Sequence, residues 1–205
     1  MNDLAWRLTA LLGRLNAKMH CIAPQTVRVG DVFRDSDLIL DLGGGGEGVI
    51  GCLRGRQVVA VDTRKDELLG TPAGPTKVVA DARSLPFPDR SFEAATAFFF
   101  LMYVATRDRR QILEEAYRVL APDGALHIWD VVIPTPGKRA RKTFVVPVRV
   151  DLPGRTIRTG YGVTWKGREM SAGAIVETAH SVGFVVTTVE QSGRTFHIGL
   201  VRPAA

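Results

Sequence analysis

The sequence is poor in cysteine and lacks any long, uninterrupted apolar segment. Its two cysteines, Cys21 and Cys52, are far apart and lie outside any Cys-x-x-Cys or histidine-rich context, so neither a disulfide framework nor a metal site is indicated. No stretch reaches the roughly 18 consecutive apolar residues of a membrane-spanning helix. Three basic residues interrupt the leucines of the first twenty residues, which is not the pattern of a secretory signal. We therefore expect a cytoplasmic protein without a transmembrane segment.

The sequence also lacks internal repeats and low-complexity linkers, and its composition is that of a folded globular chain. Of its 205 residues, 45% are hydrophobic and 23% are charged, which favours one domain spanning residues 1–205. The charge is unevenly placed, because residues 131–205 carry 11 Lys and Arg against 4 Asp and Glu. Two interpretations remain open: a solvated, arginine-rich surface, or a basic rim that attracts an anionic substrate, a nucleic acid or a lipid headgroup.

Strand-like segments alternate with helix-like segments over most of the chain. Strand patterns lie at 37–42, 57–62, 76–81, 92–100 and 125–132, and helical patterns lie at 46–55, 63–70 and 107–120. The residues APDG, between the helical pattern at 107–120 and the strand pattern at 125–132, predict a turn. This alternation is typical of a doubly wound α/β fold, in which a mostly parallel sheet has helices on both faces.

The two ends of the chain depart from this alternation. Leucines at helical spacing in the first twenty residues predict an amphipathic N-terminal helix, which we assign to residues 1–24. Residues 142–163 predict an inserted β-hairpin around the turn LPGR, and residues 171–182 predict a helix that ends at Gly183. A second hairpin over 184–201 would complete a seven-stranded sheet and give it an antiparallel C-terminal edge strand.

A glycine-rich segment, LILDLGGGGEGVIG, follows the first predicted strand. Gly43, Gly45 and Gly48 satisfy the pattern Gly-x-Gly-x-x-Gly, and Asp62 ends the second predicted strand, where an acid would bind a ribose. A dinucleotide-binding turn is therefore one interpretation, although this pattern alone is weakly specific.

Two carboxylates flank the glycines and argue against a dinucleotide. Asp41 ends the strand that leads into the turn, and Glu47 is expected to begin the following helix. A dinucleotide would place its pyrophosphate at the start of this helix, where both carboxylates would repel it. A cofactor that carries an amine and a sulfonium in place of phosphates would be attracted. S-adenosylmethionine is such a molecule.

Four segments, taken in order, resemble the motifs of one enzyme family. They are LILDLGGGGEG, VVAVDTRKDEL, VVADARSLPFPDRSFEAATA and ILEEAYRVLAPDGALHIWD, and they fall within residues 37–132. This region resembles the class I (Rossmann-like) S-adenosylmethionine-dependent methyltransferases of the small-molecule, methyltransferase-domain type. The resemblance implies an enzyme that uses S-adenosylmethionine as its cofactor and transfers a methyl group to a small-molecule acceptor.

The resemblance assigns the methionine part of the cofactor to the glycine-rich turn. Asp41 would orient the methionine amine, and Gly43, Gly44 and Gly45 would let the backbone approach the methionine portion closely. The family commonly has a third glycine in this motif, where the present sequence has Glu47. This departure is expected to alter the turn.

The resemblance assigns the nucleoside part to two later segments. Asp62 would accept hydrogen bonds from both ribose hydroxyls, and Thr63 would lie beside them. Asp81 would meet the exocyclic amine of the adenine, and Ala82 would supply a backbone contact.

The acceptor side of the site follows the fourth predicted strand. The resemblance places Phe98 and Phe99 along the methyl-donor pocket, while core packing is the alternative for at least one of the phenylalanines at 98–100. Many relatives continue with a Leu-His-His-like stretch, whereas this sequence has Leu-Met-Tyr at 101–103. Catalysis by a histidine is therefore not expected at this position.

Methyl transfer from a sulfonium is an in-line displacement with a neutral leaving group, so a base is required only if the acceptor must lose a proton. Ligands of open α/β sheets lie outside the carboxyl ends of the strands. Asp130 ends the fifth predicted strand and Tyr103 follows the fourth, so both are candidates for contacting the acceptor. Alternatively, Asp130 caps backbone N–H groups and Tyr103 is a partly buried core aromatic.

The segment 137–168 is expected to determine substrate specificity, because inserted loops at the ligand face vary with function. Tyr161 and Trp165 lie there among basic residues, and they either stack on a planar acceptor or cover the edge of the core. We expect a small-molecule acceptor of anionic or aromatic character. A nucleic acid is less favoured, because the segment is short and has no RNA-binding motif. The expected organisation is an N-terminal helix (1–24), a cofactor-binding core (37–132), the substrate-side segment (137–168) and a C-terminal helix and hairpin (170–205).

Two alternatives to a methyltransferase remain at this point. A non-catalytic S-adenosylmethionine-binding or partner module would use the same turn without transferring a methyl group. An NAD-type dinucleotide-binding protein would use the same glycines and the same acid at Asp62.

Overall fold

The computed structural model describes residues 18–30, 32–138 and 141–204. Most of the predicted N-terminal helix lies outside these residues. Its described end is different from the prediction, because β1 (Met19–Cys21) and β2 (Gln25–Arg28) are strands. Both pair in parallel with β8 (Thr143–Leu152), so a partner that is distant in the sequence determines their extended conformation.

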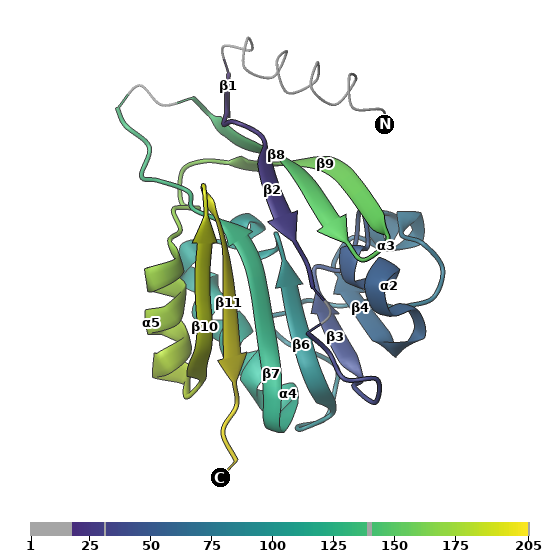
Figure 1. Cartoon of the computed structure of the whole chain (residues 1–205). Helices are drawn as coiled ribbons and strands as arrows, with labels where there is room; N and C mark the ends of the chain where they lie inside the picture. The colour runs from purple at the N-terminus through teal and green to yellow at the C-terminus, as the bar shows by residue number, and fades with distance from the viewer. Residues whose placement is uncertain (1–17, 31, 139–140, 205) are drawn as a thin grey trace.

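The main sheet has seven strands in the order β10-β11-β7-β6-β3-β4-β5 (Figure 1). These are β3 (Ile39–Leu42), β4 (Val58–Asp62), β5 (Thr76–Val79), β6 (Phe92–Phe98), β7 (Leu120–Val131), β10 (Val185–Ser192) and β11 (Thr195–Val201). The five strands from β3 to β7 pair in parallel. The predicted mostly parallel, seven-stranded sheet with antiparallel pairing at its C-terminal side is confirmed.

The antiparallel strand, however, does not form the edge of the sheet. β11 pairs antiparallel with both β7 and β10, and β10 is the outermost strand. The apolar pattern explains this order. Phe196, Ile198 and Leu200 of β11 are buried, whereas β10 is largely exposed and carries Val185 and Val189 on the surface. The more apolar strand of the hairpin therefore takes the interior position.

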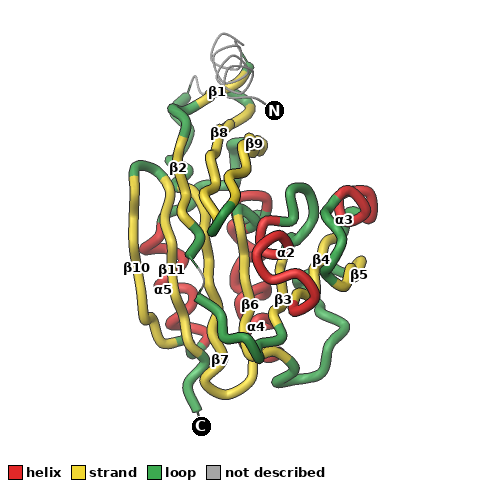
Figure 2. Tube along the Cα trace, turned by 45° about the vertical axis from the view of Figure 1, so that its right-hand side comes forward, coloured by secondary structure: helices red, strands yellow, loops and turns green. Residues whose placement is uncertain are grey.

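Short helices connect the strands and cover both faces of the sheet. They are α2 (Val49–Arg54), η1 (Gly55–Gln57), α3 (Lys65–Gly70), η2 (Leu101–Tyr103), η3 (Thr106–Asp108), α4 (Arg109–Val119) and α5 (Ala172–Val182). In Figure 2, α4 and α5 lie behind the sheet and α2 lies in front of it. The Ser171 side chain caps α5 by accepting a hydrogen bond from the Ala174 N–H, and Gly183 ends this helix with φ of 114°, as its sequence predicts.

The residues predicted as the turn APDG belong to an irregular part of β7. Leu120 pairs with Phe92, but the next pair on β6 joins Ala94 to Ala125. The extra residues form a bulge, in which Asp123 has φ of 59°. A bulge lets the strand begin immediately after α4 and still keep its register with β6.

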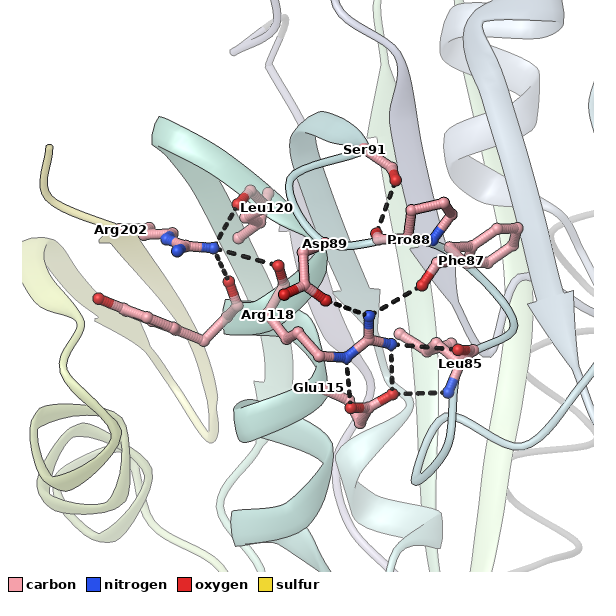
Figure 3. Close-up of polar contacts among 10 residues, drawn as sticks. Leu85, Phe87, Pro88, Asp89, Ser91, Glu115, Arg118, Leu120 and Arg202 are labelled. Carbon is pink, nitrogen blue, oxygen red and sulfur yellow. Dashed lines mark hydrogen bonds and ion pairs between the residues drawn. The ribbon is translucent and has the colours of Figure 1, made fainter. Parts of the chain in front are cut away.

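Two arginines fix the C-terminal end of α4 (Figure 3). Arg118 is bound by Glu115 and Asp89 and donates to the carbonyls of Phe87 and Leu85. Arg202, beyond β11, donates one Nη1 to the carbonyls of Tyr117, Arg118 and Leu120. These contacts satisfy carbonyls that a helix end leaves without partners. Arg118 and Arg202 therefore join α4 to the loop before β6 and to the segment that follows β11.

A second sheet lies over the carboxyl ends of the parallel strands (Figures 1 and 2). The inserted hairpin of β8 and β9 (Arg155–Thr164) is present as predicted, and β8 also pairs with β1 and β2. Residues near the N-terminus therefore hold the hairpin in place. Within the described part of the chain, no helix has the length and hydropathy to cross a membrane.

Two histidines pack together between the sheet and the segment before β3. The His127 Nδ1 on β7 lies 3.1 Å from the His197 Nε2 on β11, and the ring of Trp129 stacks on His197 at 4.5 Å. The ring of Phe33 contacts His127 edge-on. Burial, together with the neighbouring imidazole, lowers the pKa of His127 to about 4. His127 is therefore a neutral core histidine.

We predict that acid destabilises this packing through His127. Because the folded pKa of about 4 lies below the ordinary value of 6.5, the contribution of His127 is complete above pH 6.5 and is lost as pH falls toward 4. In urea unfolding, the free energy of unfolding of the wild-type protein should fall by about 2 kcal/mol more than that of His127→Gln when the pH is lowered from 7.5 to 5. Equal losses in the two proteins would contradict this assignment.

Candidate active site

A cavity of about 740 Å³ opens at the carboxyl ends of the central strands and beneath β9, which is within the size range of small-molecule sites. Every residue that the sequence assigned to cofactor binding lines it, namely Asp41, Gly43, Gly44, Gly45, Asp62, Thr63, Asp81, Ala82, Phe98 and Phe99. Tyr103 lines it as well, but Asp130 does not. The fold thus brings together residues from four separate segments.

The glycine-rich turn runs close to β4 and leaves no room for side chains. Gly43 has φ of 71°, and the N–H groups of Gly43 and Gly44 both donate to the Val61 carbonyl, at 2.8 and 3.0 Å. A Cβ on Gly43 would lie 2.3 Å from the Phe100 ring, and one on Gly44 would lie 2.8 Å from the Asp41 Oδ2. Only glycine fits these positions, so the turn presents bare backbone to the cavity.

Glu47 is part of this turn. The prediction that Glu47 begins the following helix is wrong. Gly46 and Gly48 have positive φ values of 68° and 56°, which extend the turn until α2 begins at Val49. The Glu47 carboxylate instead meets the inserted hairpin, where it accepts hydrogen bonds from the hydroxyls of Thr159 and Tyr161. The glycine-rich turn is therefore tied to β9.

Asp41 is a buried carboxylate directly beneath the turn. It ends β3 between β4 and β6 and accepts a hydrogen bond of 2.7 Å from the Thr96 hydroxyl. Burial is the main cause that raises the pKa of Asp41 to about 7, and the nearby Asp62 raises it further. A charge in this position is costly unless a cation compensates for it.

Asp62 and Asp81 are two further acids that line the cavity. Asp62 is the last residue of β4 and accepts the Arg64 N–H at 2.9 Å through its Oδ1, while its Oδ2 faces Gly45. Asp81 forms an ion pair of 2.6 Å with Arg83, and this contact lowers the pKa of the Asp81 carboxyl. Thr63 and Ala82 lie beside these acids in the lining.

An aromatic wall faces the glycine-rich turn. The ring of Phe99 stacks on that of Tyr161 at 4.7 Å, with 17° between their planes. Phe99 adopts φ of 48°, a conformation that is unfavourable for a bulky residue and is found where the surroundings enforce it, often at functional sites. Phe98 also packs on Phe99 and lines the same cavity.

The structure separates the two predicted catalytic residues. Tyr103 lies at the cavity, and its hydroxyl accepts the Gly162 N–H at 3.3 Å. Asp130 is fully buried and accepts the N–H groups of Met102 and Val131. Burial raises the pKa of Asp130 to about 7. Its position therefore suits the alternative interpretation, in which it binds the backbone that follows β6.

The two aromatic candidates of the inserted segment also differ. Tyr161 lines the cavity, but the Trp165 ring is buried against Phe144 and His20, and its Nε1 donates to the Pro134 carbonyl at 2.7 Å. Trp165 therefore belongs to the core and cannot stack on a ligand. The contacts between Glu47 and β9 were not among the sequence-based predictions. Thr159 and Tyr161 are two positions apart, which places their side chains on the same face of a strand.

Comparison with known proteins shows which family the central part of the chain resembles. Residues 40–128 match a family described as "Methyltransferase domain". The chain is 33% identical over 135 residues, which cover 66% of it, to the demethylmenaquinone methyltransferase of Thermus thermophilus. Over these residues the chain is similar to the methyltransferase-domain family. It is also 35% identical over 80 residues, or 39% of its length, to the mitochondrial 2-methoxy-6-polyprenyl-1,4-benzoquinol methylase of Bos taurus.

These matches cover only part of the relatives. They span 58% of the Thermus enzyme and 24% of the bovine enzyme. Among solved structures, an S-adenosylmethionine-dependent methyltransferase of Methanosarcina mazei aligns with a TM-score of 0.62 at 19% identity, covering 84% of this chain and 95% of that one. At this identity, the structural match supports the methyltransferase-domain fold.

The buried Asp41 carboxyl gives the fold a stability cost that can be measured. Because the folded pKa of about 7 lies above the ordinary 3.8, stability falls as pH rises from about 4 to about 7. Asp41→Asn keeps the shape, and the Thr96 hydroxyl can still donate to the Leu40 carbonyl. At pH 8 we expect the free energy of unfolding of this variant to be about 1–3 kcal/mol higher than that of the wild type. The difference should be smaller at pH 5. A variant less stable at pH 8 would contradict this account.

Proposed function

We propose that this protein transfers a methyl group from S-adenosylmethionine to a small-molecule acceptor. The observation that carries the proposal is the buried Asp41 carboxylate beneath the glycine-rich turn, which accepts a hydrogen bond from Thr96 in place of an ion pair. A cationic group bound at the turn would compensate for this charge. S-adenosylmethionine presents an amine and a sulfonium there, together with a nucleoside that suits the acids on the neighbouring strands.

The residues of the cavity fit each part of this cofactor. The bare backbone of Gly43 to Gly45 would approach the methionine portion, and Asp41 would attract its amine. Asp62 would accept hydrogen bonds from the ribose, because its Oδ2 faces the turn. Asp81 and Ala82 would meet the adenine. When bound, the cofactor supplies an electrophilic methyl group on a cationic sulfur.

The chain itself would position the reacting groups and exclude water from them. Tyr161 and Phe99 form one wall of the cavity, and the contacts of Glu47 with β9 close it on the acceptor side. Holding the reacting atoms in line in a water-poor site contributes roughly 7–11 kcal/mol in model reactions. Tyr103, whose pKa burial raises, stays protonated at neutral pH and can donate a hydrogen bond to the acceptor.

The acceptor class is proposed from the cavity and the relatives together. The names of the two curated relatives specify a demethylmenaquinone and a polyprenyl benzoquinol. An aromatic wall of Phe98, Phe99 and Tyr161 would suit a planar ring of comparable kind. We therefore favour a small hydroxylated aromatic acceptor over a nucleic acid.

We also propose that the protein acts in a reducing compartment such as the cytoplasm. Cys21 and Cys52 do not form a disulfide with each other. Disulfides are rare in proteins of reducing compartments.

The isosteric change Asp41→Asn tests which cofactor the turn binds. It should weaken S-adenosylmethionine binding by about 1.5–3 kcal/mol, the range for a hydrogen bond to a charged group. Calorimetry should also show wild-type affinity rising from pH 5.5 to pH 7.5, as Asp41 ionises, with a flatter profile in the variant. If the turn bound a pyrophosphate, the same change would remove a repulsion and raise NADH affinity. Unchanged S-adenosylmethionine affinity in a folded variant would refute the proposed cofactor site.

Transfer itself is tested with methyl-labelled S-adenosylmethionine and fractionated metabolites, including hydroxylated aromatics. We expect label in a small-molecule product. Asp62→Ala should weaken donor binding by about 1–3 kcal/mol, whereas Glu114→Ala, on the exposed face of α4, should leave it unchanged. A protein that binds the donor tightly and labels no fraction would instead be a non-catalytic binding module.

A further inference from the structure

The charged groups of the cavity are mostly paired with one another. Arg64 forms ion pairs with Asp66 and Glu67, at 2.6 and 3.0 Å. Arg83 is bound by Asp81 at 2.6 Å and lies 3.6 Å from Asp108. These two arginines are therefore neutralised by carboxylates of the same rim, and a ligand would have to compete with those carboxylates for them.

Arg168 is different. Its side chain lines the cavity, yet within the described residues its only side-chain hydrogen bond runs from Nη1 to the carbonyl of the preceding Gly167, at 3.3 Å. Its Nε is buried and has no hydrogen-bond partner among those residues. Unlike Arg64 and Arg83, the Arg168 guanidinium has no carboxylate partner among the described residues.

The backbone around Arg168 is held firmly. Arg109 is buried and donates to the carbonyls of Leu101, Arg168 and Glu169, at 3.3, 3.0 and 2.7 Å. Arg109 thus ties the turn at 167–169 to the segment that follows β6. The backbone from which the Arg168 side chain extends is consequently fixed to the rest of the fold.

We propose that Arg168 binds a carboxylate inside the cavity, and this inference rests on the proposed function. The planar guanidinium can pair with a carboxylate through two parallel hydrogen bonds. Arg107, which lines the same cavity and lies 3.6 Å from Asp108, adds positive charge at its exposed rim.

Two molecules in the reaction could supply this carboxylate. One is the methionine portion of the donor. The other is an acceptor that carries an acid group, for which Tyr103 and Tyr161 provide aromatic surfaces in the same cavity. Both sources require the same contact from Arg168, and they differ in which ligand loses affinity when the guanidinium is removed.

Calorimetry on the full-length protein separates these sources. The probes are S-adenosylhomocysteine, 5′-methylthioadenosine, which lacks the amino-acid tail, and a set of aromatic acids (benzoate, salicylate and 4-hydroxybenzoate) added to protein saturated with S-adenosylhomocysteine. The amides of the three acids are the neutral controls. The variants are Arg168→Gln, Arg168→Lys and, as a matched control outside the cavity, Arg110→Gln, whose guanidinium binds Glu114 and Ser181.

A donor carboxylate is indicated if Arg168→Gln weakens S-adenosylhomocysteine at least tenfold and leaves 5′-methylthioadenosine unchanged. An acceptor carboxylate is indicated if S-adenosylhomocysteine binding is unchanged while at least one acid binds more tightly than its amide and loses this advantage in Arg168→Gln. In both cases Arg168→Lys should be intermediate, and Arg110→Gln should match the wild type.

The proposal is overturned if Arg168→Gln binds S-adenosylhomocysteine like the wild type and no acid binds better than its amide to the wild type. This result would leave the proposed function intact, because donor binding is measured in the same experiment. A wild-type protein that binds neither S-adenosylhomocysteine nor 5′-methylthioadenosine would refute both proposals together.

Discussion

The burial of one carboxylate at the end of a central strand is the constraint on which this site depends. Asp41 lies between β4 and β6, and the parallel register places Ala60 on one side of it and Thr96 on the other. Ionising a carboxyl in such a place costs free energy, as its pKa of about 7 shows. The glycine-rich turn can pass directly over it because neither Gly43 nor Gly44 has a side chain.

The inserted hairpin turns this strand end into a closed site. The carboxyl ends of a parallel sheet form an open crevice, and β8 and β9 lie across it. Among the contacts that connect the hairpin to the core are those of Glu47 with the hydroxyls of Thr159 and Tyr161, and that of the Tyr103 hydroxyl with the Gly162 N–H. Pairing with β1 and β2 supports the hairpin from its other side. Strands from near the N-terminus thus support the hairpin that covers the cavity.

Three unfavourable features lie at this cavity. Asp41 is a buried acid, Phe99 has a left-handed backbone, and the Arg168 Nε is buried without a partner. At the end of α4, by contrast, the polar groups are well satisfied by Arg118 and Arg202. Native proteins tolerate local costs where binding or catalysis requires them.

Local patterns in the sequence determined much of the fold. Continuous apolar runs ended by acids predicted β3 and β4, and serine and glycine marked the two ends of α5. These signals are local, because strand burial and helix capping depend on neighbouring residues. The same logic selected Asp41, Asp62 and Asp81 as candidate residues, since strand ends of a parallel sheet meet along one edge.

Other features depended on contacts between distant segments, which a single sequence does not reveal. The strand conformation of Met19–Cys21 comes from pairing with β8, and the interior position of β11 comes from its more apolar faces. Positive φ at Gly46 and Gly48 moved Glu47 out of the helix and toward β9. Packing also decided that Asp130 faces the backbone of Met102 while Arg168 faces the cavity. The sequence by itself determined the elements and the chemistry at the strand ends. The tertiary structure decided which side chains share the cavity, because their directions depend on packing between elements far apart in the chain.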